Sequence, residues 1–163
     1  MAEQTSWDEG FLDRFSPRVQ EKLISLAEPF RFKAGQAIIG AGDTSQYLYV
    51  VKSGQVVVEI YVPPKGRCRI RTGGAGDMIC WSALVEPRRA TAAVRATEDT
   101  EAFGIRGQVL MDECRKDHEL GFELYRALTE VIAGRLNATR LQFACTLLAM
   151  GTGKDPQTRS DLR

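Results

Sequence analysis

Between residues 30 and 105 the chain alternates short β-type segments with turns rich in glycine, and this alternation constrains its fold most. The segments are rich in β-branched and aromatic residues, which strands prefer. They cover residues 30–33, 37–39, 47–51, 56–62, 67–72, 91–96 and 102–105. Many short strands at this spacing predict a mainly β fold, an antiparallel β-roll of the double-stranded β-helix or jelly-roll type. We expect positive φ at four turn glycines, which are Gly35, Gly42, Gly54 and Gly76.

Helices are predicted on both sides of this β region. Ser16 is a suitable N-cap and Pro17 suits the first helical position, and apolar residues recur at helical spacing up to Ala27. A short amphipathic piece that contains Phe11 and Phe15 precedes that helix. After Gly107 the apolar residues predict another short helix, and the proline-free stretch from Leu120 to Met150 predicts a long one.

The long helix carries two apolar rows. One row has alternating spacings of three and four residues, as in a heptad seam, and consists of Leu124, Ala127, Val131, Gly134, Ala138, Leu141, Cys145 and Leu148. A second row holds Leu128, Ile132, Leu136, Phe143 and Leu147. One row can face the domain and the other a partner, so we predict a homodimer whose interface is the first row. The alternative is one buried helix with no partner.

These patterns divide the chain into four parts. Residues 1–10 form a polar N-terminal segment, and residues 11–118 form the β-roll with its flanking helices. Residues 119–150 form the long C-terminal dimerisation helix, and residues 151–163 form a polar tail that we expect to be disordered.

Composition excludes several classes of protein. The net charge of +1 provides no global field for nucleic acid or for an anionic membrane. No apolar run is long enough to span a bilayer, and residues 1–10 lack the features of a secretory signal, so we expect a cytoplasmic protein that contacts no membrane.

The chain also lacks the residue patterns of a metal site or an enzyme. The four cysteines form no C-x-x-C pair, and with a single histidine they predict free thiols rather than a zinc site. No acid/base pair of carboxylates and no common catalytic motif is present, so we expect no enzymatic activity. Three alternating arginines, Arg67, Arg69 and Arg71, predict a solvated basic stripe on one face of a strand.

An ordered series of motifs resembles a known family. The series comprises Phe32–Ile39, Ala41–Asp43, Tyr47–Val56, Gly76–Ile79 and Thr91–Ala96. It is similar to the cyclic nucleotide-binding domains that form the effector half of bacterial regulators of the catabolite-activator and FNR type. The resemblance extends from about Phe11 to Met150.

The resemblance implies a phosphate-binding cassette between Ile79 and Ala92. In the family, a short helix in the cassette directs backbone N–H groups at the cyclic phosphate, an arginine neutralises the phosphate and a glutamate accepts a ribose hydrogen bond. When Val94 is aligned with the family's valine, Cys80 falls at the usual glycine, Trp81 at the glutamate and Ala90 at the arginine. Candidate ligand-binding residues are Cys80, Trp81, Ser82, Ala83, Arg88, Arg89, Ala90, Thr91 and Ala92.

The cassette therefore departs from the family at three positions. An indole cannot accept the ribose hydrogen bond, and alanine brings no charge. Loss of two charge-assisted hydrogen bonds, at about 1.5–3 kcal/mol each, weakens cyclic-nucleotide binding by roughly two to four powers of ten. The Trp81 ring either fills the pocket or stacks on a different aromatic ligand. Backbone donors and the Thr91 hydroxyl are retained.

These observations favour a stand-alone regulatory or sensor module that is homodimeric and does not bind cyclic AMP or cyclic GMP in the usual way. We expect no cofactor other than a cyclic nucleotide or another anionic, nucleotide-like ligand, and a protein partner of unknown identity. The family's transcription factors append a DNA-binding domain, whereas only 13 residues follow Met150 here, so we expect no sequence-specific DNA binding by this chain alone.

Two alternative functions stay open. In one, the chain is a genuine cyclic AMP or cyclic GMP switch that grips the phosphate through Arg89 or Arg88. In the other, it is a thiol redox sensor that uses Cys80 or Cys145.

Overall fold

The computed structural model describes residues 10–150, in two compact units that meet between Ala127 and Leu128. Predictions for residues 1–9 and for the tail 151–163 lie outside the described residues. No helix in residues 10–150 combines the length and the apolar character that a membrane span requires.

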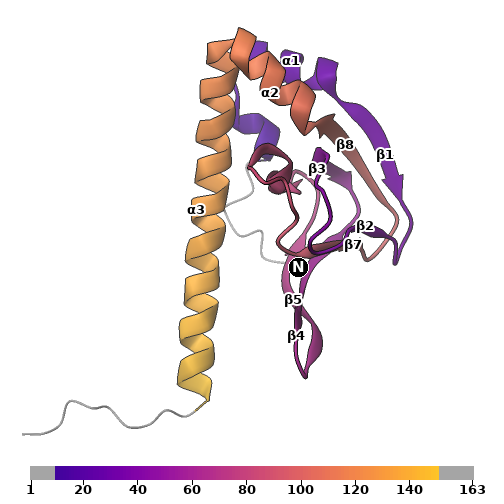
Figure 1. Cartoon of the computed structure of the whole chain (residues 1–163), viewed down its shortest axis with the longest axis vertical. Coiled ribbons are helices and arrows are strands. Elements are labelled where there is room, and N and C mark those ends of the chain that lie inside the picture. Colours follow the sequence, from indigo (N-terminus) through magenta and orange to yellow (C-terminus); the bar gives the residue numbers. More distant parts are fainter. Residues whose placement is uncertain (1–9, 151–163) are drawn as a thin grey trace, which may run out of the picture. The chain divides into compact units, whose positions relative to one another are not determined.

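The elements follow the predicted order (Figure 1). The helices are η1 (Phe11–Arg14), α1 (Pro17–Leu26), η2 (Trp81–Leu84), α2 (Gly107–Lys116) and α3 (His118–Ala149). The strands are β1 (Glu28–Phe32), β2 (Ala37–Ile39), β3 (Tyr47–Ser53), β4 (Val56–Val62), β5 (Gly66–Gly73), β6 (Met78–Ile79), β7 (Ala93–Ala96) and β8 (Thr100–Arg106). The two-residue strand β6 is an element that the sequence did not predict, whereas η2 lies where the resemblance implies a short helix in the cassette.

Two antiparallel sheets form the roll, in the orders β1-β8-β3-β6 and β2-β7-β4-β5. Chain neighbours lie in different sheets except for β4 and β5, which form a long hairpin. This arrangement confirms the predicted antiparallel roll.

The space between the sheets is filled by a core cluster, which we define as nine buried residues from both sheets and the segment after β6. They are Phe32, Tyr49, Val51, Val56, Ile79, Cys80, Val94, Ala96 and Ala102. Phe30 and Tyr47 pack against them at the edge, and the rings of Phe30 and Tyr49 meet edge to face at 5.1 Å between centroids. Burial raises the pKa of Tyr49 to about 12, because a phenolate is poorly solvated inside the roll.

The opposite face of the first sheet supports the helices. Leu48 pairs with Ile105 across β3 and β8, and both side chains are buried on the face away from Tyr49. Helices α1 and α2 lie against β8, which Figure 1 shows at the upper end of the roll. The sheet therefore separates two apolar layers.

Helix α1 is tied to the first turns of α3 by polar contacts. Ser16 donates hydrogen bonds from its backbone N–H and from its hydroxyl to the Glu123 carboxylate, both at 2.8 Å. Ser16 occupies the predicted N-cap position, but its side chain bonds α3 rather than its own helix. The Arg18 guanidinium also forms two hydrogen bonds to Asp117, which precedes α3.

The turn glycines adopt the predicted backbone. Gly35, Gly42, Gly54 and Gly76 all have φ between +83° and +89°. Gly54 has the strictest requirement, because a Cβ there would lie 2.6 Å from the carbonyl oxygen of Asp99. Any side chain would therefore collide with the turn before β8.

A β-bulge corrects the prediction of a basic stripe on β5. Arg69 pairs with Glu59 and Arg71 pairs with Val58, so that Ile70 is an extra residue in β5. Val58 packs against the core cluster, and Arg71 is half-buried in a 2.6 Å ion pair with Asp77. Arg71 therefore belongs to the inner side of the sheet, away from Arg67 and Arg69.

Candidate functional site

The segment that corresponds to the cassette runs from β6 through η2 to β7. Cys80 is the N-cap of the single-turn helix η2, which contains Trp81, Ser82 and Ala83. Residues 85–92 then form a loop against the turn that precedes β3. Backbone hydrogen bonds hold the two loops together. The Ser45 N–H donates to the Arg88 carbonyl at 2.7 Å, and the Ala90 N–H donates to the Asp43 carbonyl at 2.9 Å.

Cys80 has a left-handed backbone, with φ of 60° and ψ of 39°. A non-glycine residue pays a conformational cost of roughly 1–2 kcal/mol in this region, which gives a physical reason for the glycine that the resembled family has here. The side chain is buried and belongs to the core cluster. Cys80 therefore places a thiol inside the roll, at the position where the resemblance implies a glycine.

Trp81 and the two residues after it have different surroundings. Ser82 and Ala83 are buried, and the Ala83 N–H donates to the Cys80 carbonyl within the turn. Trp81 is half-buried and is not a member of the core cluster. The residue of this segment that fills the roll is Cys80, so the interpretation that the Trp81 ring adds to the core receives no support.

Arg88 is held by two partners from the same chain. Its Nε lies 2.9 Å from Oε1 of Glu86, and its Nη1 donates to Oε1 of Gln108 at 2.8 Å. Gln108 lies in the first turn of α2 and donates in turn to Asp112. Because Arg88 and Gln108 are 20 residues apart, no sequence pattern predicted this link between the cassette and α2.

Arg89 and Ala90 take part in the loop-to-loop contact. The Arg89 guanidinium donates to the carbonyl of Gly42 at 2.9 Å, and its backbone forms a bridge with Thr44. Ala90 is buried, with its carbonyl accepting from the Gly42 N–H. Thr91 is exposed and Ala92 is half-buried, just before β7.

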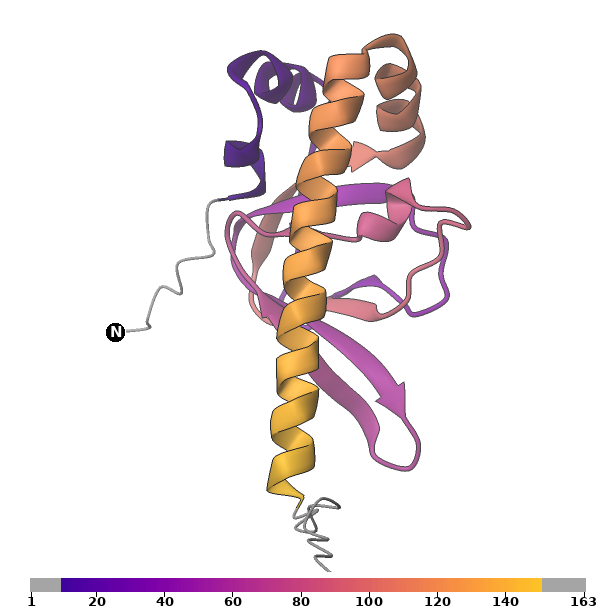
Figure 2. The same cartoon turned by 90° about the vertical axis from the view of Figure 1, so that its left-hand side faces the viewer.

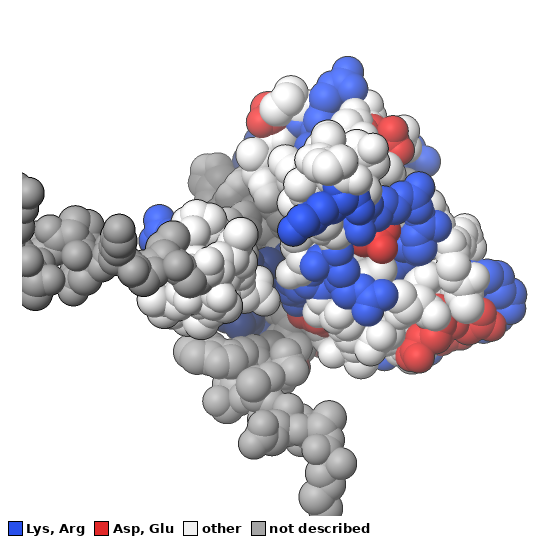
Figure 3. Space-filling model, turned by 90° about the horizontal axis from the view of Figure 1, so that it is seen from below, with Lys and Arg blue, Asp and Glu red and all other residues white. Residues whose placement is uncertain are grey.

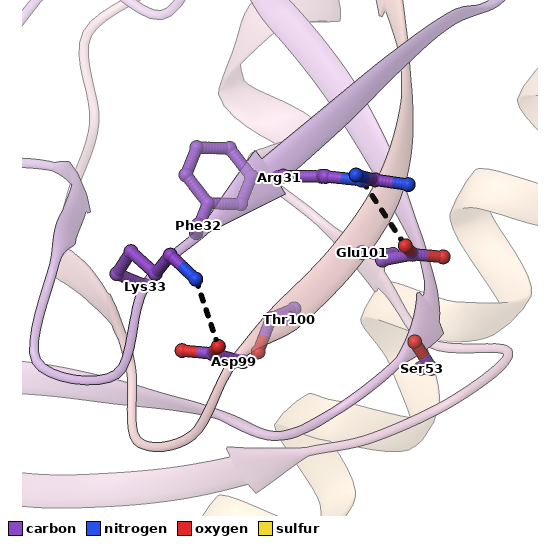
Figure 4. A pocket seen from close by; sticks show the side chains of 7 residues that line it. All are labelled: Arg31, Phe32, Lys33, Ser53, Asp99, Thr100 and Glu101. Carbon is purple, nitrogen blue, oxygen red and sulfur yellow. Dashed lines mark hydrogen bonds and ion pairs between the residues drawn. The ribbon is translucent and has the colours of Figure 1, made fainter.

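A separate pocket of about 380 Å³ lies at the C-terminal end of β1 (Figure 4). It is lined by Arg31, Phe32, Lys33, Ser53, Asp99, Thr100 and Glu101. Ion pairs join its cations to its carboxylates, at 3.2 Å for Arg31–Glu101 and 3.1 Å for Lys33–Asp99. The Ala34 N–H and the Lys33 ammonium hold the pKa of Asp99 below its usual value. The charges of this pocket are thus satisfied within the chain.

The residues of the predicted dimer interface do not share one environment. Leu124 and Ala127 are fully buried within the first of the two units. They cannot contact a partner chain, which corrects their assignment to the dimer interface. Val131 is half-buried. The remaining members, Gly134, Ala138, Leu141, Cys145 and Leu148, are exposed.

The second apolar row is also exposed in the later part of α3. Leu136 is 49% exposed and Phe143 is 65% exposed. Without Leu128, which is buried, and Leu147, the row joins three threonines at positions 129, 139 and 146 into a series spaced by threes and fours. The hydroxyls of Thr139 and Thr146 donate to Arg135 and Gln142 carbonyls of their own helix, which leaves their methyl groups for packing.

Residues 29–117 match the family model described as cyclic nucleotide-binding domain. No sequence among the curated proteins matches this chain. Solved structures do match. A cyclic nucleotide-binding domain from Methylobacillus flagellatus KT is 20% identical with a TM-score of 0.76, and the match covers 81% of this chain and 74% of that one.

Two bacterial proteins match over smaller shares of their own length. The catabolite activator protein of Thermus thermophilus has a TM-score of 0.69 at 20% identity, with coverage of 83% of this chain and 62% of that one. FixK2 of Bradyrhizobium japonicum has a TM-score of 0.59 at 21% identity, with coverage of 70% and 54%. At these identities the structures establish a shared fold.

Proposed function

The chain belongs to the family of cyclic nucleotide-binding domains, and we propose that it is a regulatory module. We propose further that the arginines of its cassette bind groups of the same chain instead of a nucleotide. In this proposal it does not bind cyclic AMP or cyclic GMP in the family's usual way. The observation that carries it is the state of Arg88 and Arg89, the two guanidinium groups of the cassette, since each is already bonded within the chain.

A phosphate would have to displace those partners. At Arg88 it competes with two partners, the Glu86 carboxylate and the Gln108 amide. At Arg89 it competes with one neutral carbonyl, that of Gly42. Arg89 is therefore the group that an anion would capture more readily, and the alternative of a genuine switch depends on it.

The interior of the roll supports the same proposal. Cys80 adds its side chain to the core cluster, which also contains Val94 of β7 and Tyr49 of β3. Trp81 and Ala90 supply neither the carboxylate nor the charge of the family's ligand-binding residues. A nucleotide therefore meets fewer favourable contacts and less space.

Titration calorimetry with cyclic AMP and cyclic GMP tests the proposal. We expect the affinity to be roughly two to four powers of ten weaker than that of a cassette with both charge-assisted hydrogen bonds, at about 1.4 kcal/mol per power of ten. The matched variants are Arg89→Ala in the cassette and Arg31→Ala outside it. Micromolar binding that Arg89→Ala abolishes and Arg31→Ala preserves would establish the switch instead.

We further propose that the module is a homodimer through the second apolar row of α3. Its contact residues would be Thr129, Ile132, Leu136, Thr139, Phe143 and Thr146, which are spaced by threes and fours. Exposed leucine and phenylalanine side chains in one row require cover, and a second copy of the same helix offers an identical row. Leu124 of the first row and Leu128 of the second are both buried, so only the later residues of either row can meet a partner. We propose the second row because Leu136 and Phe143 present more apolar surface at its middle than Gly134 and Ala138 do in the first.

Cysteine cross-linking distinguishes the two rows. At 100° per residue, Cys145 lies about 150° around the helix from the centre of the second row, whereas residue 139 lies within it. We expect mild oxidation to join Thr139→Cys protomers in a Cys145→Ser background and to leave Cys145 of the natural chain unjoined. Efficient joining through Cys145 alone would restore the first row.

The surroundings of the described cysteines support the thiol redox alternative less well than the main proposal. Cys80 is buried in the roll, and burial raises the pKa of Cys114, which disfavours its thiolate. Cys145 is exposed on α3. Non-reducing gels after peroxide treatment test this alternative, and a covalent dimer that Cys145→Ser removes would support it.

We also propose that the chain has no catalytic activity. Asp77 is bound to Arg71 and Glu86 to Arg88, so the candidate carboxylates near the cassette are engaged in ion pairs. No group of three or more ligands for a metal ion occurs in residues 10–150. The regulatory output then depends on contact with another protein.

A further inference from the structure

The β4–β5 hairpin extends beyond the rest of the roll in both views (Figures 1 and 2). β5 ends the strand order of its sheet, so β4 pairs with one of its sides. In residues 10–150 no strand pairs with the other side. An unpaired strand edge presents backbone N–H and C=O groups that can pair with an extended chain.

Two arginines lie on the outer face of this edge strand. Arg67 pairs with Tyr61, and Arg69 pairs with Glu59, before the bulge at Ile70 changes the register. Both arginines are exposed, and residues two apart on a strand lie about 7 Å apart on the same face. The stretch Gly66–Arg69 is therefore a regular edge with two cations on one face.

The charges of these cations are not balanced on the hairpin. Among the ion pairs of the described residues, none involves Lys65, Arg67 or Arg69. The carboxylate opposite Arg69 is Glu59, which is mostly buried and lies 3.6 Å from Nε of Arg95. Figure 3 shows Lys and Arg side chains gathered on the side of the molecule that bears the hairpin. This concentration contrasts with the net charge of +1 for the whole chain.

We propose that the outer edge of β5 binds an acidic, extended segment of a partner protein as an added antiparallel strand. Side chains at alternate positions of such a segment repeat at the same spacing of about 7 Å, so two carboxylates can lie opposite Arg67 and Arg69. The bulge at Ile70 ends the regular edge, which limits the docked stretch to about four residues. The proposal names the kind of partner that the regulatory module of the previous section contacts, but it needs neither an occupied cassette nor a dimer.

Two other uses of the same residues have to be separated from this one. Charged side chains on an edge strand also prevent edge-to-edge aggregation without binding anything. A single-stranded nucleic acid would use the cations for its phosphates and Tyr61, which is 71% exposed, for stacking. Only the added strand uses both the arginines and the backbone edge.

Fluorescence anisotropy with the full chain and a labelled peptide of eight alternating Glu and Thr residues tests the proposal. The control peptide has the same composition with its four Glu residues in one block. We expect the alternating peptide to bind at least about tenfold more tightly, and salt to weaken its binding. Equal affinity for the two peptides would overturn the proposal.

Variants identify the surface. Arg67→Glu with Arg69→Glu should weaken binding of the alternating peptide by at least about tenfold, since two opposite-charge pairs become repulsive. Arg31→Glu, an exposed cation on β1 outside the hairpin, is the matched control and should leave affinity within about twofold. Glu59→Gln should tighten binding by a few fold, because it removes the carboxylate opposite Arg69.

The backbone edge has its own test. Alternate N–H groups of an added strand face β5, so N-methyl groups on either the Glu or the Thr residues of the alternating peptide remove all of those donors, and we expect one of these two peptides to lose binding. Undiminished binding of both peptides would overturn strand addition. So would tighter binding of an oligothymidylate that Tyr61→Ala abolishes. A third outcome would also overturn the proposal: the double Glu variant aggregates, and the unsubstituted chain does not bind the alternating peptide. The arginines would then only prevent edge-to-edge aggregation.

Discussion

The first ten residues of α3 and its later residues differ in the exposure of their leucine side chains. In its first ten residues, Leu120, Leu124 and Ala127 are fully buried within the unit of residues 1–127. In the later part, Leu136, Phe143 and Leu148 are among the most exposed large apolar side chains of the described residues. The sequence of both parts is similarly rich in leucine and alanine. One face of the first part of α3 therefore belongs to a domain core, although Phe122 there is 68% exposed, and the later part presents exposed apolar side chains.

The largest expected effect comes from truncating the buried part. Leu124→Ala should lower the free energy of unfolding by about 2–5 kcal/mol, because it leaves a cavity in the core. Leu141→Ala, the matched change at an exposed position of the same predicted row, should cost well under 1 kcal/mol. Urea unfolding at low protein concentration measures both. Equal costs would remove the distinction between the two parts of α3.

A smaller effect, confined to assembly, is expected from charges in the second apolar row. Leu136→Glu with Phe143→Glu should raise the dimer dissociation constant by at least about 100-fold, since each buried carboxylate loses its hydration. Leu141→Glu with Leu148→Glu places the same charges on the other side and should change it little. Sedimentation velocity over a concentration series measures the constants, and the opposite ranking of the variants would return the interface to the first row.

The smallest expected effect is the response of the first part of α3 to acid. The backbone N–H of Ser16, followed by its hydroxyl, holds the pKa of Glu123 below its usual value, and the Arg18 guanidinium lowers that of Asp117. A carboxyl with a lowered folded-state pKa contributes stability that is complete above its unfolded pKa of roughly 4 and is lost as the pH falls through the folded value.

Hydrogen exchange at pH 6 and pH 3 measures this response. Protection factors of residues 118–127 should be lower at pH 3 than at pH 6, whereas those of residues 128–149 should not show this decrease. Glu123→Gln should lower protection of the first part already at pH 6 and reduce the further loss on acidification. A uniform loss along α3 would show that Ser16 and Arg18 do not hold its first part separately.

Local patterns predicted most elements of the fold because the forces behind them act over a few residues. Strand segments alternate with period two, the turn glycines need positive φ, and the 32 residues of α3 contain no proline. The assignment of Trp81 and Ala90 as departures from the family comes from the sequence and stays a prediction. The predicted dimer row failed at its first two members, since periodicity does not reveal which of two apolar rows meets the roll.

By itself the sequence determined the succession of strands and helices, since that depends on residue type and order. The tertiary structure decided the partners of individual polar and charged groups. It brought Gln108 to Arg88 and Gly42 to Arg89, placed Glu123 on Ser16, and turned Arg71 away from Arg69 through a bulge. These contacts join residues far apart in the chain or depend on strand register, and they form only when packing has closed the intervening loops.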